Sequence, residues 1–255
     1  MIKLPNLIIV GAAKSGTTTL FNELRRHPNI FIPSIKECRF FSQMSRDMKG
    51  GDAATFQNEG PRELNCYLKL FENCNEENIL DISNDYFYYY NKSIKNIIST
   101  YKKIGLPQPK ILIILRNPIE RVFSMYHHII RLNSDFLNFD EAFEESSIKI
   151  KNNYAWIFDL KNVGMSFEPC KAYIENFKEV KIILFDEFKR GNLISQVYDF
   201  IGLEKNDLEK DIIISNVNTY SNSRFKKFRW ILSNLKNYFI KREILANHKN
   251  SFFYK

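Results

Sequence analysis

A lysine inside a glycine-bounded loop is the feature of this sequence that points most directly to chemistry. The sequence here predicts a buried strand, Leu7–Val10, followed by a loop from Gly11 to Gly16 and a helix that starts at Thr17. Such a loop aims backbone N–H groups and a helix N-terminus at one point, which makes a phosphate cradle. A Walker A loop has its lysine directly after the second glycine, whereas Lys14 lies within this loop. The loop is therefore predicted to bind a nucleotide phosphate differently from an ATPase loop.

A second candidate anion site follows the most aliphatic segment of the chain, Ile111–Leu115. Arg116 lies just past this predicted strand, and Ser124 lies further on, in the helix that Pro118 is predicted to start. Ligands bind at the carboxyl edge of open parallel sheets, where an arginine and a serine hydroxyl can hold an anionic group. An ATPase would be expected to have an acidic residue at a strand end for Mg²⁺. The cationic strand end favours a ligand with an extra phosphate over one that depends on metal.

Together these segments resemble the sulfotransferase family, whose members use 3′-phosphoadenosine 5′-phosphosulfate (PAPS). The loop Gly11–Thr18 looks like their 5′-phosphosulfate-binding loop, and segment 115–124, LRNPIERVFS, resembles their 3′-phosphate-binding segment. The segment Lys36–Phe41, KECRFF, is similar to a K-E-x-x-x-F segment of carbohydrate and heparan-type members. Segment 216–224 resembles a late loop that closes over the 3′-phosphate. The resemblance implies a P-loop nucleotide-kinase-like α/β fold.

The resemblance also implies roles for individual residues. Lys14 would contact the bridging oxygen and the sulfuryl group, and Glu37 would take the proton of the acceptor hydroxyl. A carboxylate with a pKa of ~4.3 is a weak base, so proton transfer must run together with bond formation. No metal is expected, because a sulfuryl group carries less charge than a phosphoryl group. The implied donor-binding residues are Lys14, Ser15, Gly16, Thr17, Thr18, Arg116, Ser124 and Arg224.

Two positions near the predicted acceptor site depart from the family pattern. Heparan-type relatives often have a histidine two residues after the base, where this chain has Arg39. Many relatives read Glu-Lys-Ser/Thr-Pro-x-Tyr at the next strand, where this chain begins with Asp81, Ile82 and Ser83. The family lysine, a cation near the acceptor, is therefore replaced by Ile82. Arg39, Asp81 and Ser83 are candidates for acceptor binding, and capping of a neighbouring element is the alternative for Asp81.

Aliphatic strands alternate with helical patterns along the chain. This alternation predicts a central parallel sheet with helices on both faces, a three-layer α/β fold. The sequence contains no repeat or low-complexity linker, so residues 1–255 are predicted to form one domain, with a mobile polar loop at 42–60. The predicted strands are 7–10, 79–82, 111–115 and 180–185, and the predicted helices are 17–26, 92–101, 118–132 and 193–201.

The net charge of +8 is concentrated in the C-terminal segment 224–255. This segment holds nine Lys or Arg and one acidic residue, while the rest of the chain holds 28 of each sign. Its aromatic residues predict the last helix of the domain, with its lysines in water. Peripheral contact with an anionic membrane surface is the alternative. No nucleic-acid partner is expected, because no binding motif accompanies the charge.

The remaining composition bounds the compartment and the function. No apolar run approaches the roughly 18 residues of a membrane span, and the N-terminus does not resemble a signal peptide. A cytoplasmic protein, or a soluble piece of a longer one, is expected. The four cysteines form no C-x-x-C pair, so no zinc site is expected.

The sequence predicts a PAPS-dependent sulfotransferase acting on a hydroxyl of a carbohydrate or glycolipid. One alternative is a P-loop nucleotide kinase or NTPase, against which the missing lysine after Gly16 counts. Another is a degenerate, non-enzymatic nucleotide-binding module, because Ile82 stands where the family has a lysine.

Overall fold

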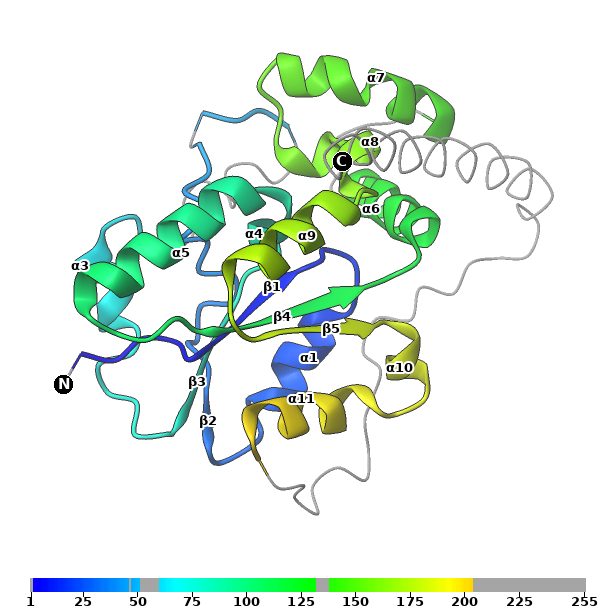
Figure 1. Ribbon diagram of the computed structural model, residues 1–255. Helices are drawn as coiled ribbons and strands as arrows, with labels where there is room; N and C mark the ends of the chain where they lie inside the picture. The colour runs from blue at the N-terminus through cyan, green and yellow to red at the C-terminus, as the bar shows by residue number, and fades with distance from the viewer. Residues whose placement is uncertain (1, 46, 51–59, 132–137, 204–255) are drawn as a thin grey trace, which may run out of the picture.

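The structure, a computed structural model, describes residues 2–45, 47–50, 60–131 and 138–203 (Figure 1). Arg224, the basic segment 224–255 and most of the predicted loop 42–60 lie outside these ranges. The strands are β1 (Leu7–Gly11), β2 (Ile30–Phe31), β3 (Asn78–Ile82), β4 (Lys110–Leu115) and β5 (Val180–Leu184). The helices are α1 (Thr17–Leu24), α3 (Leu64–Lys69), α4 (Asp85–Tyr88), α5 (Tyr90–Ile104), α6 (Pro118–Arg131), α7 (Phe139–Lys151), α8 (Leu160–Val163), α9 (Phe167–Asn176), α10 (Asp186–Lys189) and α11 (Leu193–Ile201), with a short 3-10 helix, η1, at Trp156–Phe158.

The five strands form a parallel sheet in the order β2-β3-β1-β4-β5. Strand β1 lies in the middle, where Leu7 pairs with Leu80 on one side and with Lys110 on the other. After β1 the chain builds β2 and β3 on one side, and it then crosses to build β4 and β5 on the other. Open parallel sheets bind ligands at the carboxyl edge beside such a change of direction. The loop after β1 lies at that point.

Helices cover both faces of the sheet, which confirms the predicted three-layer α/β fold. Helices α5 and α9 pack on one face, and α1 and α11 pack on the other (Figure 1). Strand β1 is buried along its whole length and alternates between the two cores. Ile8 and Val10 lie in the core with α5, whereas Leu7 and Ile9 lie in the core with α1. This alternation is what a central strand of a doubly covered sheet requires.

A third apolar cluster lies beyond the carboxyl edge of the sheet. It is built from α6, α7 and α8 (Figure 1) together with η1, and Val122, Phe143 and Trp156 are among its buried residues. Helix α7 begins with a capping box, in which Asn138 Oδ1 accepts from Glu141 N at 3.0 Å and Asn138 N donates to the Glu141 carboxylate at 3.3 Å. These helices therefore enclose one side of the carboxyl edge of the sheet.

The predicted elements agree with the structure to within a few residues at each end. Helix α5, for example, runs from Tyr90 to Ile104, whereas the sequence pattern indicated 92–101. Strand β2 and the helices α3, α4, α7, α8 and α10 were missed. Strand β2 has only two residues and therefore no detectable pattern. Within the described ranges, no helix is long and apolar enough to cross a membrane.

Gly11 lies at the end of β1, where the start of the loop passes close to α4. Its φ is +137°, and a Cβ there would lie 2.9 Å from Phe87 Cβ and 3.0 Å from the Asn84 carbonyl oxygen. Gly105, at the C-cap of α5, also has a positive φ, +78°, but a Cβ there would meet nothing within 4 Å.

We expect Gly11→Ala to lower the free energy of unfolding by about 3 kcal/mol or more, because it combines an unfavourable φ with a clash against α4. The matched control Gly105→Ala should lose only about 1 kcal/mol, since it meets the unfavourable φ alone. Urea denaturation of the two variants measures the difference. Equal losses would show that the close approach to α4 does not require glycine.

Candidate active site

The loop between β1 and α1 ends in an uncapped helix N-terminus. Gly16, the N-cap of α1, has φ 87° and ψ 10°, and no side chain caps the helix. Lys14 is also left-handed, with φ 65°. Ser15 is fully buried, and its hydroxyl has no hydrogen-bond partner among the described residues. Unpaired donors at a helix start are the groups that a bound anion satisfies, so the loop fits the predicted phosphate ligand.

Arg116 fastens this loop from the end of β4. Its Nη1 donates to the Lys14 carbonyl oxygen at 3.2 Å, and its guanidinium pairs with Glu120 at 3.1 Å. The guanidinium carbon also lies 4.8 Å from the centre of the Phe185 ring. Ser124 is buried on α6. The structure thus brings Arg116 against the loop, while 3′-phosphate binding by Arg116 and Ser124 stays a prediction.

Segment 35–43 brings Glu37 to the carboxyl end of β3. Glu37 N donates to the Ile82 carbonyl oxygen at 3.1 Å, and Arg39 N donates to Ser83 Oγ at 3.2 Å. Glu37 and Arg39 have φ values of 64° and 55°. With Lys14 they make three of the five non-glycine residues in the described chain that have a positive φ. Strained backbone of this kind gathers at functional sites.

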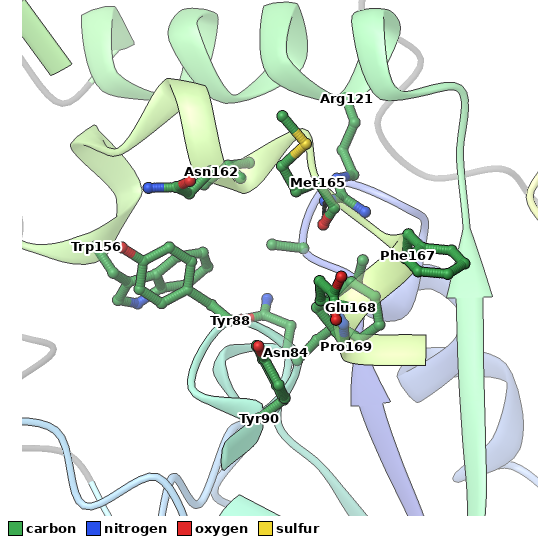
Figure 2. Close-up of a pocket in the computed structure, with 14 residues that line it drawn as sticks. Asn84, Tyr88, Tyr90, Arg121, Trp156, Asn162, Met165, Phe167, Glu168 and Pro169 are labelled. Atoms are coloured by element: carbon green, nitrogen blue, oxygen red, sulfur yellow. Dashed lines mark hydrogen bonds between the residues drawn. The ribbon is translucent and has the colours of Figure 1, made fainter. Parts of the chain in front are cut away.

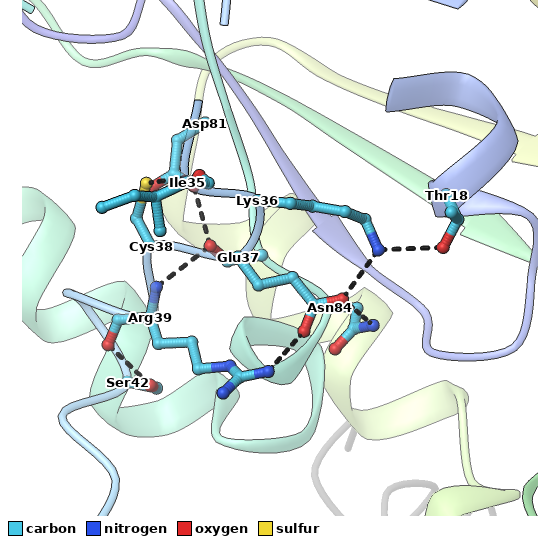
Figure 3. A network of polar contacts seen from close by, with 10 residues as sticks. Thr18, Ile35, Lys36, Glu37, Cys38, Arg39, Ser42, Asp81 and Asn84 are labelled. Atoms are coloured by element: carbon cyan, nitrogen blue, oxygen red, sulfur yellow. Dashed lines mark hydrogen bonds and ion pairs between the residues drawn. The ribbon is translucent and has the colours of Figure 1, made fainter. Parts of the chain in front are cut away.

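Three side chains hold the Glu37 carboxylate (Figure 3). Oε2 accepts from Arg39 at 2.7 Å, and Oε1 accepts from Asn84 at 2.8 Å and from Lys36 at 3.0 Å. Burial by itself raises the pKa of Glu37, but the charges and hydrogen bonds of Lys36 and Arg39 outweigh it and lower that pKa below its usual value. Glu37 is therefore ionised at neutral pH.

Lys36 joins the Glu37 segment to the loop. Its Nζ, which contacts Glu37, also donates to Thr18 Oγ1 at 2.8 Å, and Thr18 lies in the first turn of α1 (Figure 3). Sequence reasoning missed both Lys36 and Asn84 as members of the site. The adjacency of Lys36 to Glu37 was a usable signal. Asn84 offered none, because its contact with Glu37 depends on how distant segments pack.

Lys14 is half-buried among like charges. Burial is the largest cause that lowers its pKa, and three nearby cations lower it further, namely Arg131, Lys36 and Arg116. Glu37 opposes them, and the resulting pKa of Lys14 is about 8. The positive charges come from separate segments of the chain and meet at one loop. Such a concentration attracts an anionic ligand and is relieved by it.

Asp81 and Ser83 lie beneath the Glu37 segment. Asp81 is fully buried, and its carboxylate accepts from the hydroxyls of Ser83, Tyr67 and Tyr86 at 2.7, 2.8 and 2.9 Å. Burial raises the pKa of Asp81, and these hydrogen bonds oppose the rise. The geometry favours a supporting role for Asp81, and its contact with an acceptor stays a prediction.

Ile82, which stands where the family has a lysine, is buried in the sheet core. Arg39 is also buried and pairs with Glu37 at 2.7 Å. Positive charge beside Glu37 therefore comes from Lys36 and Arg39 instead of position 82. Acceptor binding by Arg39 stays a prediction.

Comparisons with known proteins agree with this geometry. Residues 4–255 match the family described as the sulfotransferase domain. The crystal structure of a sulfotransferase from Alicyclobacillus acidocaldarius is similar, with a TM-score of 0.75 and 28% identity, over 91% of this chain and 93% of that one.

Curated relatives are similar over shorter parts of their length. Heparan sulfate glucosamine 3-O-sulfotransferase 3B1 from Homo sapiens is 24% identical over 212 residues, which are 80% of this chain and 47% of that protein. Membrane-associated sulfotransferase kil1 from Dictyostelium discoideum is 27% identical over 134 residues, which are 51% of this chain and 24% of that protein. The chain therefore spans less than half the length of these two relatives.

We expect the Lys14 amine to react with acetic anhydride with a midpoint near pH 8, because burial and nearby cations lower its pKa to about 8. Lysines in water have a pKa of ~10.4, so the midpoint for exposed lysines should lie roughly two pH units higher. Peptide mass spectrometry measures labelling at each pH. Lys36→Met removes one neighbouring cation and should move the Lys14 midpoint upward. A wild-type midpoint at the ordinary value would contradict the electrostatic account of the loop.

Proposed function

The chain belongs to the sulfotransferase domain family, and we propose that it transfers a sulfuryl group from PAPS to a hydroxyl group of a carbohydrate or glycolipid acceptor. The observation that carries the proposal is the half-buried Lys14, which lies within the loop and is near enough to the ionised Glu37 for that carboxylate to raise the pKa of Lys14. A kinase that uses ATP and Mg²⁺ would have its lysine after Gly16. The three side chains that hydrogen-bond the Glu37 carboxylate argue against a non-enzymatic nucleotide-binding module.

The loop and the end of β4 are proposed to hold the donor. PAPS supplies a sulfuryl group that is activated by its bond to a phosphate oxygen. Backbone N–H groups of residues 16–18 and the unpaired Ser15 hydroxyl would hold the 5′-phosphate at the start of α1, and the Ser15 N–H, predicted as a further donor, bonds the Ala12 carbonyl oxygen at 3.2 Å in the described loop. Arg116 and Ser124 would hold the 3′-phosphate. Arg224, the further proposed ligand of that phosphate, lies outside the described residues.

Lys14 is proposed to stabilise the charge that develops on the phosphate oxygen as the sulfur–oxygen bond breaks. A cation fixed at this point is worth most in a partly buried site, where its field is weakly screened. Its pKa of about 8 describes the protein without ligand. Negative charge bound in the loop would raise that pKa, so Lys14 stays charged when it acts.

Glu37 is proposed to take the proton of the acceptor hydroxyl. The two cations on its carboxylate make it a weak base, so the proton must move as the new bond to sulfur forms. Lys36 contacts both Glu37 and Thr18. It can turn toward negative charge at Thr18 and release Glu37 Oε1. Glu37 would therefore gain basicity when the donor site is filled.

Adenosine 3′,5′-bisphosphate should raise the melting temperature of the protein more than ATP with Mg²⁺ does, because it carries the additional 3′-phosphate that Arg116 would hold. At 100 times its Kd a ligand stabilises the fold by about 2.7 kcal/mol. Arg116→Ala should reduce the shift, whereas the exposed control Arg190→Ala should not. Differential scanning fluorimetry measures all four cases. An equal or larger shift with ATP and Mg²⁺ would overturn the assigned donor.

Glu37→Gln should lower the rate of sulfuryl transfer by about 10²–10⁴-fold, since an amide of the same shape cannot take the proton. Transfer of labelled sulfate from PAPS to a panel of glycans measures the rate. Binding of adenosine 3′,5′-bisphosphate should remain, which separates a lost base from a lost fold. The control Glu145→Gln, on α7, should keep the wild-type rate. Full activity of Glu37→Gln would remove Glu37 from the role of base.

A further inference from the structure

A pocket of 390 Å³ adjoins the loop between β1 and α1. Figure 2 shows side chains around an open space, with Trp156 and Tyr88 on one side, Asn162 and Met165 above, and Asn84 below. Ala12 and Ala13, which directly precede Lys14, form part of its wall. Asn84 also donates to Glu37 at 2.8 Å, so the pocket opens beside the proposed base. Its volume falls in the range of small-molecule sites.

Arg121 brings a buried positive charge to this pocket. Its side chain is 2% exposed and descends from α6 toward Met165 (Figure 2). Its guanidinium donates to Ser166 Oγ at 3.2 Å and to the Met165 carbonyl oxygen at 3.3 Å, and it lies 5.6 Å from the centre of the Phe87 ring. These three partners are neutral.

Within the described part of the chain, Arg121 Nε has no hydrogen-bond partner and no carboxylate acts on the guanidinium. Burial lowers the pKa of Arg121 to about 10, so the group remains charged at neutral pH. A buried cation without an opposite charge costs stability. A bound anion would supply the missing charge.

Two further sets of donors lie in the wall of the same pocket. Trp156 is 4% exposed, and its Nε1 has no hydrogen-bond partner among the residues that the structure describes. Helix α9 starts at Phe167 without a side-chain cap, and its first turn lines the pocket. The free N–H groups and the dipole of a helix start attract anions. Glu168, exposed in that turn, is the acidic member of the described lining.

We propose that this pocket binds the acceptor and selects one whose hydroxyl-bearing ring also carries a single carboxylate, as in a uronic acid. This inference rests on the proposed function. The half-buried ring of Tyr88, whose centroid lies 5.2 Å from that of Trp156, offers an apolar surface to the C–H groups of a sugar ring. Arg121 and the start of α9 would bind the carboxylate. A ring hydroxyl on the opposite side would then reach Asn84 and Glu37.

Two probes that differ at one carbon test the selection. Methyl β-D-glucuronide carries a carboxylate where methyl β-D-glucoside carries a hydroxymethyl group. Calorimetry with the full chain, with and without saturating adenosine 3′,5′-bisphosphate, gives the Kd of each probe. The glucuronide should bind at least about tenfold more tightly, which is the effect of one charge-assisted hydrogen bond.

Variants assign the preference to the pocket. Arg121→Gln should bring the ratio of the two Kd values close to one, and Arg121→Lys should keep part of the preference. Glu168→Gln removes an exposed negative charge and should tighten binding of the glucuronide alone. The control Arg26→Gln, exposed just after the end of α1, should leave both Kd values unchanged.

Equal affinity of the wild-type protein for the two glycosides, or binding of neither, would overturn the inference whether or not the Arg121 variants fold. Failure to bind adenosine 3′,5′-bisphosphate would instead count against the proposed donor. The two failures are distinguishable because each ligand is also titrated alone.

Discussion

A buried carboxylate, that of Asp81, holds the site together. Hydroxyl groups from three places donate to it: Tyr67 on α3, Tyr86 on α4 and Ser83 at the end of β3. Ser83 in turn accepts from Arg39 N, which fixes the strained segment that carries Glu37. Loss of these donors would leave a buried carboxyl group without hydrogen-bond partners, at a cost of about 1–3 kcal/mol. The position of Glu37 therefore depends on a residue that lies beneath it in the core.

The site above Asp81 carries more positive than negative charge. Lys14, Arg116, Lys36 and Arg131 approach one loop, and the Glu37 carboxylate offsets only part of their charge. Burial, and after it repulsion from the neighbouring cations, makes the ammonium group of Lys14 easier to deprotonate than that of an ordinary lysine. Binding of a polyanion would relieve this repulsion. Lys36 contacts both Thr18 and Glu37. Negative charge bound at the loop would therefore also change the electrostatic environment of Glu37, the proposed base.

Position 82, where the family resemblance predicts a lysine, carries an isoleucine and brings no charge to the neighbourhood of Glu37. Ile82 adds to the apolar core between the sheet and α1. Arg39 and Lys36 flank Glu37 instead, and Arg121 lies in the wall of the adjoining pocket. In this chain, therefore, the cations nearest the proposed base belong to its own segment, while a separate buried cation lies where an acceptor is proposed to bind.

Local pattern alone determined the loop that is proposed to bind phosphate and the framework around it. Glycine spacing, aliphatic runs and Pro118 predicted β1, α1, β4 and α6, and with them the positions of Lys14 and Arg116. A capping box at Asn138 and Glu141 also carried a local signal for α7, which was overlooked. Tertiary structure alone decided that Asn84 holds Glu37, that Lys36 reaches Thr18 and that Arg121 enters a pocket behind the loop. These contacts join residues that are distant in sequence, and the packing of helices on the sheet brings them together, so no spacing in the sequence records them.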